Sequence, residues 1–130
     1  MSIDYVMIGS SNLDRSRAFY DAVFPAVGGE LDADYPGMTF CYRFRNGTRA
    51  WVSLPYDRQP ASPGNGSMPG LRCASREEVD AAHAAALAQG GQCEGAPGPR
   101  PMYGPHFYGA YARDPDGNKM SFFIDSPAEG

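Results

Sequence analysis

Apolar and polar positions along the chain predict the same series of elements twice. Residues 3–9, IDYVMIG, form a short β-branched run, and residues 12–27 follow with apolar positions along one helical face. A hairpin pattern, MTFCYRFR-NG-TRAWVSLP, occupies residues 38–55. After a segment rich in Pro, Gly and Ser at residues 56–67, a strand, a helix and a hairpin recur over residues 68–125.

This repeat predicts a single domain, residues 1–130, that is built from two modules. The first module spans about residues 1–55, the linker about 56–67 and the second module about 68–125. A small unit that leaves one sheet face exposed has a physical reason to pair with a similar unit. We therefore expect the two modules to pack against each other.

Both predicted helices carry start and stop signals. Asn12 is expected to cap the first helix, because its side chain can accept hydrogen bonds from the free amides of the first turn. Pro25 should end or kink that helix near Phe24. Ser75 and Glu78 form a capping-box pattern at the start of the second helix, and a glycine pair follows its end.

The pair Asn46-Gly47 predicts the register of the first hairpin. A two-residue type I′ turn favours this pair, because both central residues of that turn need positive φ. With these residues as the loop, Tyr42 lies opposite Trp51, and cross-strand partners share a face. One face of the hairpin is then expected to carry Phe40, Tyr42, Phe44 and Trp51.

Alternation along the first and last strands predicts which side chains point away from the helices. If Val6 and Ile8 cover the first helix, Tyr5 and Met7 point to the opposite side. The last strand divides in the same way, with Met120, Phe122 and Ile124 on the helix side and Ser121 and Phe123 opposite.

Residues 92–105, QCEGAPGPRPMYGP, form the least regular stretch of the second module. A short strand is expected near residues 92–95, but the prolines that follow disfavour a regular central strand through the rest. Two interpretations stay open for the remainder: a proline-stiffened loop over a pocket, or a plain surface connection.

Composition and charge exclude several classes of protein. Eleven basic and fifteen acidic residues give a net charge of −4 without a basic run, so no nucleic-acid partner is expected. No apolar run approaches the ~18 residues of a membrane span, and the N-terminus has no signal-peptide pattern. The three cysteines, Cys41, Cys73 and Cys93, are odd in number and favour reduced thiols, which indicates a cytoplasmic location.

Three stretches together resemble the vicinal oxygen chelate superfamily, the glyoxalase/bleomycin resistance protein/extradiol dioxygenase group. They are IDYVMIGSSNLDRSRAFYDAV, SREEVDAAHAAALAQGG and YGPHFYGAYARDPDGNKMSFF. The resemblance implies an α+β fold of two βαβββ modules, each a curved half-barrel, that enclose a cleft. It also implies a homodimer, with clefts made or completed at the subunit contact.

Metal-using members of this group hold one divalent ion with His or Glu side chains. Carried over by the resemblance, the ligand positions fall on Tyr5, about Met68, and Ser121. A phenol, a thioether and a neutral hydroxyl are poor ligands for such an ion, so neither a metal nor another cofactor is expected. Of the two histidines, His83 is expected at the edge of the core, and His106 could reach the cleft.

An aromatic cleft that lacks a metal would act through shape, ring surfaces and scattered hydrogen-bond donors. As a set, the aromatic residues fit a cleft lining and an ordinary core equally well, and no catalytic residue stands out. The residues expected to bind a ligand are Tyr5, Met7, Phe40, Tyr42, Trp51, Met68, His106, Tyr108, Ser121 and Phe123.

Three functions follow from these patterns, and the first is favoured. It is a metal-free, homodimeric member of the superfamily that binds a small organic molecule in the cleft. The second is an active lyase or isomerase of glyoxalase type, or a dioxygenase, with unorthodox ligands. The third is a structural or regulatory module with an exposed apolar patch and no enclosed pocket.

Overall fold

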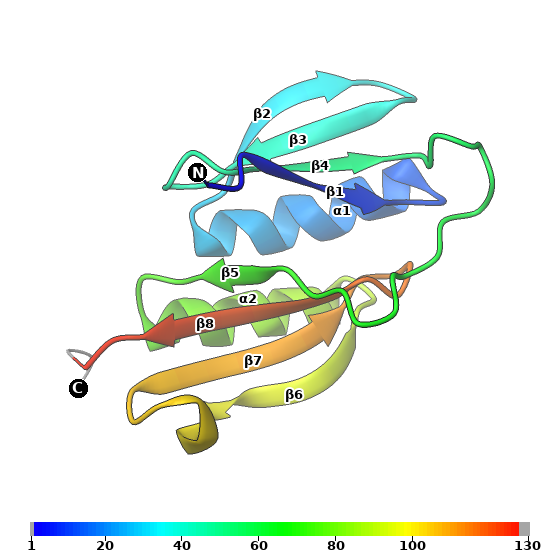
Figure 1. Cartoon of the computed structure of the whole chain (residues 1–130). Helices are drawn as coiled ribbons and strands as arrows, with labels where there is room; N and C mark the ends of the chain where they lie inside the picture. The colour runs from blue at the N-terminus through cyan, green and yellow to red at the C-terminus, as the bar shows by residue number, and fades with distance from the viewer. Residues whose placement is uncertain (1, 128–130) are drawn as a thin grey trace.

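The first module is a four-stranded sheet with one helix on one face, as seen in the upper half of Figure 1. The computed structural model describes residues 2–127 of the chain. The strand order is β1-β4-β3-β2, in which β1 runs parallel to β4 and the other neighbours are antiparallel. Its elements are β1 (Tyr5–Gly9), α1 (Leu13–Val23), the 3₁₀ helix η1 (Phe24–Val27), β2 (Glu30–Tyr35), β3 (Thr39–Arg43) and β4 (Arg49–Ser53).

The second module repeats this plan with the strand order β5-β8-β7-β6. Here β5 runs parallel to β8, and the remaining pairs are antiparallel. The elements are β5 (Gly70–Arg72), α2 (Arg76–Ala88), β6 (Gln92–Pro99), the 3₁₀ helix η2 (Pro101–Tyr103), β7 (Phe107–Arg113) and β8 (Lys119–Asp125). The predicted α+β fold of two βαβββ modules is therefore confirmed, as two open sheets.

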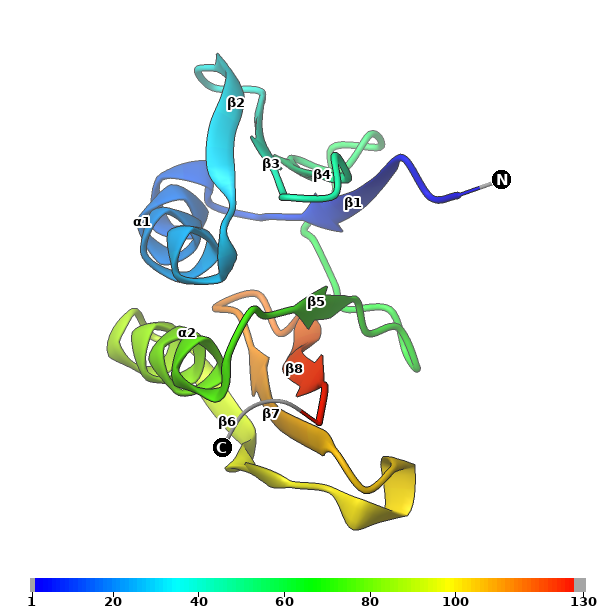
Figure 2. The same cartoon turned by 90° about the vertical axis from the view of Figure 1, so that its left-hand side faces the viewer.

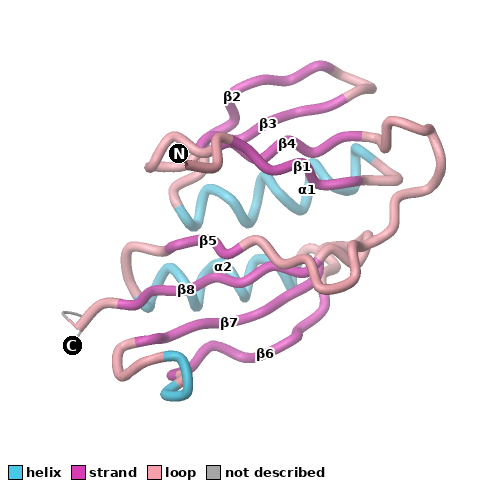
Figure 3. The backbone as a smooth tube through the Cα atoms, in the orientation of Figure 1, coloured by secondary structure: helices cyan, strands magenta, loops and turns pink. Residues whose placement is uncertain are grey.

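The two helices pack against each other and join the modules. Figures 1 and 2 show α1 and α2 side by side, each covering its own sheet, while Figure 3 shows the long loop that connects β4 to β5. Phe19 and Tyr20 of α1 and Val79 and Ala82 of α2 are fully buried in one continuous core. None of the helices in residues 2–127 is long and apolar enough to cross a membrane.

The predicted helix signals are confirmed, with one change in detail. Asn12 Oδ1 accepts from the Arg15 amide at 3.0 Å, and Ser75 Oγ accepts from the Glu78 amide at 3.1 Å. The Glu78 carboxylate, however, accepts from the Ala74 amide instead of closing the box on Ser75. The α-helical part of the first helix ends directly before Phe24, where Pro25 begins the 3₁₀ turn.

The predicted register of the first hairpin is wrong by one residue. Phe40 pairs with Val52 and Tyr42 with Ala50, so both aromatic residues share the helix face, while Trp51 lies on the other face beside Cys41. The loop is longer than two residues: the Gly47 amide donates to the Phe44 carbonyl, and the Phe44 amide donates to the Thr48 carbonyl. Because the side-chain period of a strand is two, a shift of one residue puts Phe40 and Tyr42 on the face opposite to Trp51.

The turn chemistry explains why the hairpin takes the longer loop. Among the described residues with side chains, only Arg58 has positive φ, so Asn46 does not adopt the conformation that a type I′ turn needs. Gly47 alone in this loop has positive φ, 90°, as expected for a turn that ends in a left-handed glycine.

Two edge strands differ from the sequence expectations. β2, ELDADY, was not predicted from the residue pattern: its acidic residues alternate with Leu31, Ala33 and Tyr35, but its side chains are largely exposed and its pairing shifts near Asp32. The strand expected near residues 92–95 instead continues as β6 to Pro99, with two register shifts. Pro97 and Pro99 are compatible with a strand here because β6 lies at the edge of its sheet.

Candidate ligand-binding site

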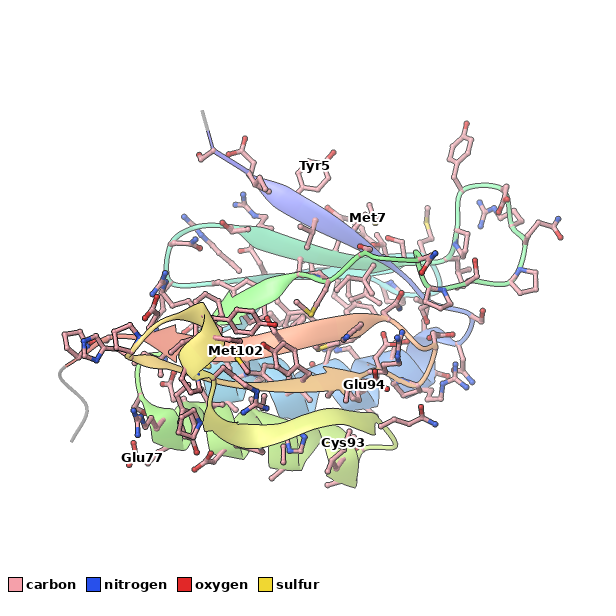
Figure 4. All side chains as sticks on the ribbon, turned by 60° about the horizontal axis from the view of Figure 1, so that its bottom comes forward. Tyr5, Met7, Glu77, Cys93, Glu94 and Met102 are labelled. Carbon is pink, nitrogen blue, oxygen red and sulfur yellow. The ribbon has the colours of Figure 1, made fainter. Side chains whose placement is uncertain are left out.

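The candidate site lies on the two sheet faces that point away from the helices, which we call the open faces. On the first sheet, Tyr5 and Met7 of β1 project from the open face and are 58% and 60% exposed (Figure 4). Met7 pairs with Trp51 of β4, which places these two side chains next to each other. Val6 and Ile8 point to the helix side, as predicted from their alternation.

On the second sheet, Ser121 and Phe123 of β8 point to the open face. Ser121 lies between Gly70 of β5 and Tyr111 of β7, and Phe123 lies between Arg72 and Gly109. The other β8 side chains, Met120, Phe122 and Ile124, are buried in the core on the helix side. The predicted division of the last strand is therefore confirmed.

A group of stacked rings covers one end of this second open face. The rings of Phe107 and Phe123 are parallel to within 3°, with centroids 5.6 Å apart, and Tyr103 meets Phe107 edge-on at 5.4 Å. The guanidinium of Arg72 lies 5.0 Å from the centroid of Phe123. Such contacts hold aromatic rings in defined positions, because cations and ring edges favour the negative ring face.

Tyr111 occupies the other end of the open face and is flanked by two cations. Lys119 Nζ lies 5.9 Å from the centroid of its ring, and the Arg100 guanidinium lies 5.6 Å from it. Arg100 also donates to the carbonyls of Ala96 and Gly98, so it supports the backbone of β6. Lys119, by contrast, makes no ion pair or side-chain hydrogen bond within residues 2–127 and contacts only this ring.

Glycines make room for these rings against the sheet. A Cβ atom at Gly109 would come within 2.9 Å of Phe107 Cε1, and one at Gly95 within 2.8 Å of Tyr111 Cδ2. A Cβ at Gly70 would lie 3.2 Å from Ser121 Oγ and 3.3 Å from Phe123 Cε1. Because these positions lack side chains, the rings can lie close over the backbone and leave a low, ring-covered surface.

Three of the predicted ligand-binding residues lie on the helix side. Phe40 and Tyr42 are 3% and 1% exposed and belong to the core. Tyr42 packs edge-on against Phe24, with centroids 5.0 Å apart, and its hydroxyl donates to Asp21 Oδ1 at 2.7 Å. Burial, with the Asp21 carboxylate beside it, raises the pKa of Tyr42 well above its ordinary value. The cleft assignment of Phe40 and Tyr42 was wrong because it followed from the wrong hairpin register.

Tyr108 is the third residue that points to the helix side. It pairs with Ile124, its hydroxyl donates to Asp80 Oδ1 of α2 at 2.7 Å, and the Arg76 guanidinium lies 4.8 Å from its ring centroid. The hydrogen bond to Asp80 raises the pKa of this phenol above its ordinary value. Its cleft assignment was wrong, and Phe107 and Tyr111 occupy the open-face positions of β7 instead.

Met68 and His106 lie at the margins of the second open face. Met68 precedes β5 and lines a shallow cavity of about 520 Å³ that also contacts Arg113 and Lys119. His106 is exposed in the turn directly before β7. A narrower cavity of about 60 Å³ lies at the junction of the modules. Met7 of the first module and Lys119 of the second module are both among its lining residues.

The residues at the positions implied for a metal do not fit a divalent ion. The structure places Tyr5 on the first sheet, Met68 in the connecting segment and Ser121 on the second sheet. Their donors are a phenol, a thioether and a hydroxyl, and hard or borderline cations bind these groups poorly. Within residues 2–127, no group of three or more His, Cys, Asp or Glu side chains is placed to hold a metal ion.

The motif DPDGN, residues 114–118, has a structural role next to this site. Asp114 is buried, and its Oδ1 accepts from the amides of Asp116 and Asn118. Tyr20 donates to Asp114 Oδ2 at 2.5 Å, and Asn118 Nδ2 donates both to that oxygen and to the Gly9 carbonyl of β1. The turn before β8 is therefore hydrogen-bonded to the first module, which fixes the two open faces relative to each other.

The sequence analysis missed several residues of the second open face. They are Gly70, Arg72, Phe107, Gly109, Tyr111 and Lys119. The alternation of HFYGAYAR could have shown this for β7, because Phe107, Gly109 and Tyr111 are two residues apart and lie on one face of the strand. Ala110 and Ala112 lie on the other face and are buried on the helix side.

Comparisons with known proteins agree with this arrangement. The family model of the glyoxalase/bleomycin resistance protein/dioxygenase superfamily matches residues 2–122. A glyoxalase/bleomycin resistance protein from Albidiferax ferrireducens T118 has a similar crystal structure, with a TM-score of 0.84 and 38% sequence identity over 94% of this chain and 98% of that chain. The chain therefore belongs to the glyoxalase/bleomycin resistance protein/dioxygenase superfamily.

More distant structures share the fold. A lactoylglutathione lyase from Agrobacterium tumefaciens has a TM-score of 0.67 and 20% identity over 95% of this chain and 92% of that chain. A glyoxalase-related enzyme from Fulvimarina pelagi has a TM-score of 0.72 and 22% identity over 95% of this chain and 88% of that chain. No match was found among curated proteins.

Proposed function

We propose that the protein binds a small organic molecule on its open faces, without a metal ion at Tyr5, Met68 and Ser121. The ring-covered surface of Phe107 and Phe123 carries this proposal, because it presents aromatic groups outside the core. Flat, partly apolar molecules are the ligands that such a surface favours, and a few polar groups around it would orient them.

A catalytic function has less support from the positions of the side chains. A general base needs a reacting proton within hydrogen-bond reach and a group that orients it. Tyr5 and His106 are both exposed and belong to different modules, and neither makes a side-chain hydrogen bond to another residue of the described chain. Binding without turnover is therefore the function that we favour.

We also propose that the protein works as a homodimer in the cytoplasm. Tyr5, Met7 and Tyr103 are more than half exposed, and they lie on or next to the open faces. A second copy of the chain would bury these apolar side chains and would convert two shallow faces into a cleft. The cytoplasmic location is supported by three cysteines that are all free thiols.

Thermal unfolding with a panel of planar aromatic compounds and with Ni²⁺, Zn²⁺, Mn²⁺ and Fe²⁺ tests the binding proposal. We expect aromatic compounds to raise the Tm, and Phe123→Ala to reduce this rise. Tyr56→Ala is the matched control, because Tyr56 is a fully exposed ring in the linker. Calorimetry with the same four metal ions tests the metal-free proposal. Tight binding of any of them, at one ion per chain, would contradict it.

The dimer is tested separately by light scattering after size-exclusion chromatography. The expected mass is twice that of one chain, and Met7→Glu should shift it towards the monomer by placing a charge on the first open face. Leu87→Glu is the control, because Leu87 is an exposed apolar residue on α2. A wild-type mass equal to that of one chain would refute the proposed dimer. The binding proposal would still be tested separately by the thermal unfolding experiment.

A further inference from the structure

Two cations on the second open face have no acidic partner in the described part of the chain. The ion pairs between residues 2–127 all use other cations, so Arg72 and Lys119 are left with ring contacts alone. The chain as a whole has a net charge of −4, so the positive charge on this face does not follow from the overall charge of the chain. A negatively charged ligand group would therefore find complementary charge here.

Ser121 lies between these cations and has an unused hydroxyl. Lys119 precedes it by two residues on the same face of β8, and Arg72 pairs with Phe123, two residues after it. Ser121 is 5% exposed as a residue, and its Oγ makes no hydrogen bond to another residue in the described range. No fully buried side-chain oxygen in this range lacks a partner, so the Ser121 Oγ is reached by solvent and can donate to a ligand.

The surroundings define where the two ends of a ligand would lie. Residues two apart on a strand are about 6.8 Å apart, so Lys119, Ser121 and Phe123 span about 14 Å. The stacked rings of Phe107 and Phe123 lie at the far end, and Asp125 follows them on the same face. An anionic group is therefore favoured over Ser121, away from Asp125, and an aromatic body over the rings.

We propose that the ligand of this site is a planar aromatic carboxylate of one or two rings. Its carboxylate accepts from the Ser121 hydroxyl and lies between Lys119 and Arg72. Its rings extend over the Phe107 and Phe123 pair, where the absence of side chains at Gly70 and Gly109 keeps the surface low. This assignment rests on the proposed small-molecule binding function and specifies its ligand class.

Calorimetric titration with 2-naphthoate and 2-naphthamide separates the charge from the ring. The two probes have similar size and shape, but only the first is an anion at pH 7. We expect 2-naphthoate to bind about tenfold more tightly, and expect its affinity to fall with added salt. Lys119→Gln and Arg72→Gln should each lower the affinity for 2-naphthoate about fivefold. Neither substitution should change the affinity for 2-naphthamide.

The controls distinguish the site from a general charge effect. Ser121→Ala should also weaken 2-naphthoate, whereas Arg58→Gln, which removes an exposed arginine of the linker, should not. Equal affinities for the two probes would overturn the carboxylate assignment, and so would an Arg58→Gln effect as large as that of Lys119→Gln or Arg72→Gln. Neither result would contradict the binding of a small molecule. If neither probe binds and no aromatic compound raises the Tm, the proposed function fails together with its ligand class.

Discussion

The phenol of Tyr20 donates a 2.5 Å hydrogen bond to the carboxylate of Asp114, and this bond connects the two modules. Tyr20 lies in α1, whereas Asp114 begins the turn before β8. Both residues are buried, and burial together with the Asp114 charge raises the pKa of Tyr20 well above its ordinary value. The phenol therefore stays protonated and available as a donor at physiological pH.

We expect Tyr20→Phe to destabilise the protein by about 1–3 kcal/mol, because it removes a donor from a buried carboxylate. The measurement is the free energy of unfolding from urea denaturation. Tyr35→Phe is the control, since Tyr35 is 56% exposed and its loss of a hydroxyl should change little. Equal effects of the two substitutions would mean that the bond to Asp114 does not stabilise the folded state.

The hairpin register makes a separate prediction about Phe40. Because Phe40 is buried in the core, Phe40→Leu should lower the free energy of unfolding by about 1–2 kcal/mol. Phe107→Leu, the same change on the second open face, should cost less because Phe107 is only half-buried. Urea denaturation measures both losses of unfolding free energy. A larger loss for Phe107→Leu than for Phe40→Leu would indicate that Phe40 is on an exposed face and would contradict its observed pairing with Val52.

A pH-dependent contribution is expected from the ion pair that joins Arg45 of the first module to Glu78 of α2. The two guanidinium nitrogens of Arg45 donate to the Glu78 carboxylate at 2.6 and 3.1 Å, which lowers the pKa of Glu78 below 4.5. A lowered folded-state pKa gives stability that is fully present above pH 4.5 and is lost as the pH falls through the folded-state value.

We therefore expect Glu78→Gln to cost about 0.5–1 kcal/mol of unfolding free energy near neutral pH, because the pair is partly exposed. The difference from the wild type should shrink as the pH falls through the lowered folded-state pKa of Glu78 and should vanish where Glu78 is protonated in both states. Urea denaturation at neutral pH and at a series of lower pH values measures it. A difference that is unchanged at the lower pH would exclude the ion pair as its cause.

The thiols should differ strongly in reactivity. Burial raises the pKa of Cys73 to about 12 and also raises that of Cys41, whereas Cys93 is exposed and its Sγ lies 3.3 Å from His83 Nε2. Because the thiolate is the reactive form, a thiol reagent should modify one cysteine in the native protein at pH 8. Mass spectrometry should locate the label on Cys93, and Cys93→Ser should abolish it until the protein unfolds.

Helix caps and strand alternation could be predicted because their causes are local. Asn12 and Ser75 accept hydrogen bonds from amides in the first turns of their own helices. The face on which Ser121 and Phe123 lie follows from the alternation of side chains along one strand. The face of Phe40 and Tyr42 could not be predicted, because it depends on whether one loop contains an extra residue. β2 was missed although Leu31, Ala33 and Tyr35 alternate with acidic residues, because it is an exposed edge strand without a run of large apolar residues.

The sequence by itself determined the superfamily resemblance, the repeated βαβββ plan, and the poor ligand character of Tyr5, Met68 and Ser121, because these depend on residue type and order along the chain. Only the tertiary structure placed Arg72, Ser121 and Lys119 around one ring-covered surface. That arrangement depends on how β5, β7 and β8 pair, and pairing between strands distant in sequence is set by the packing of the whole domain.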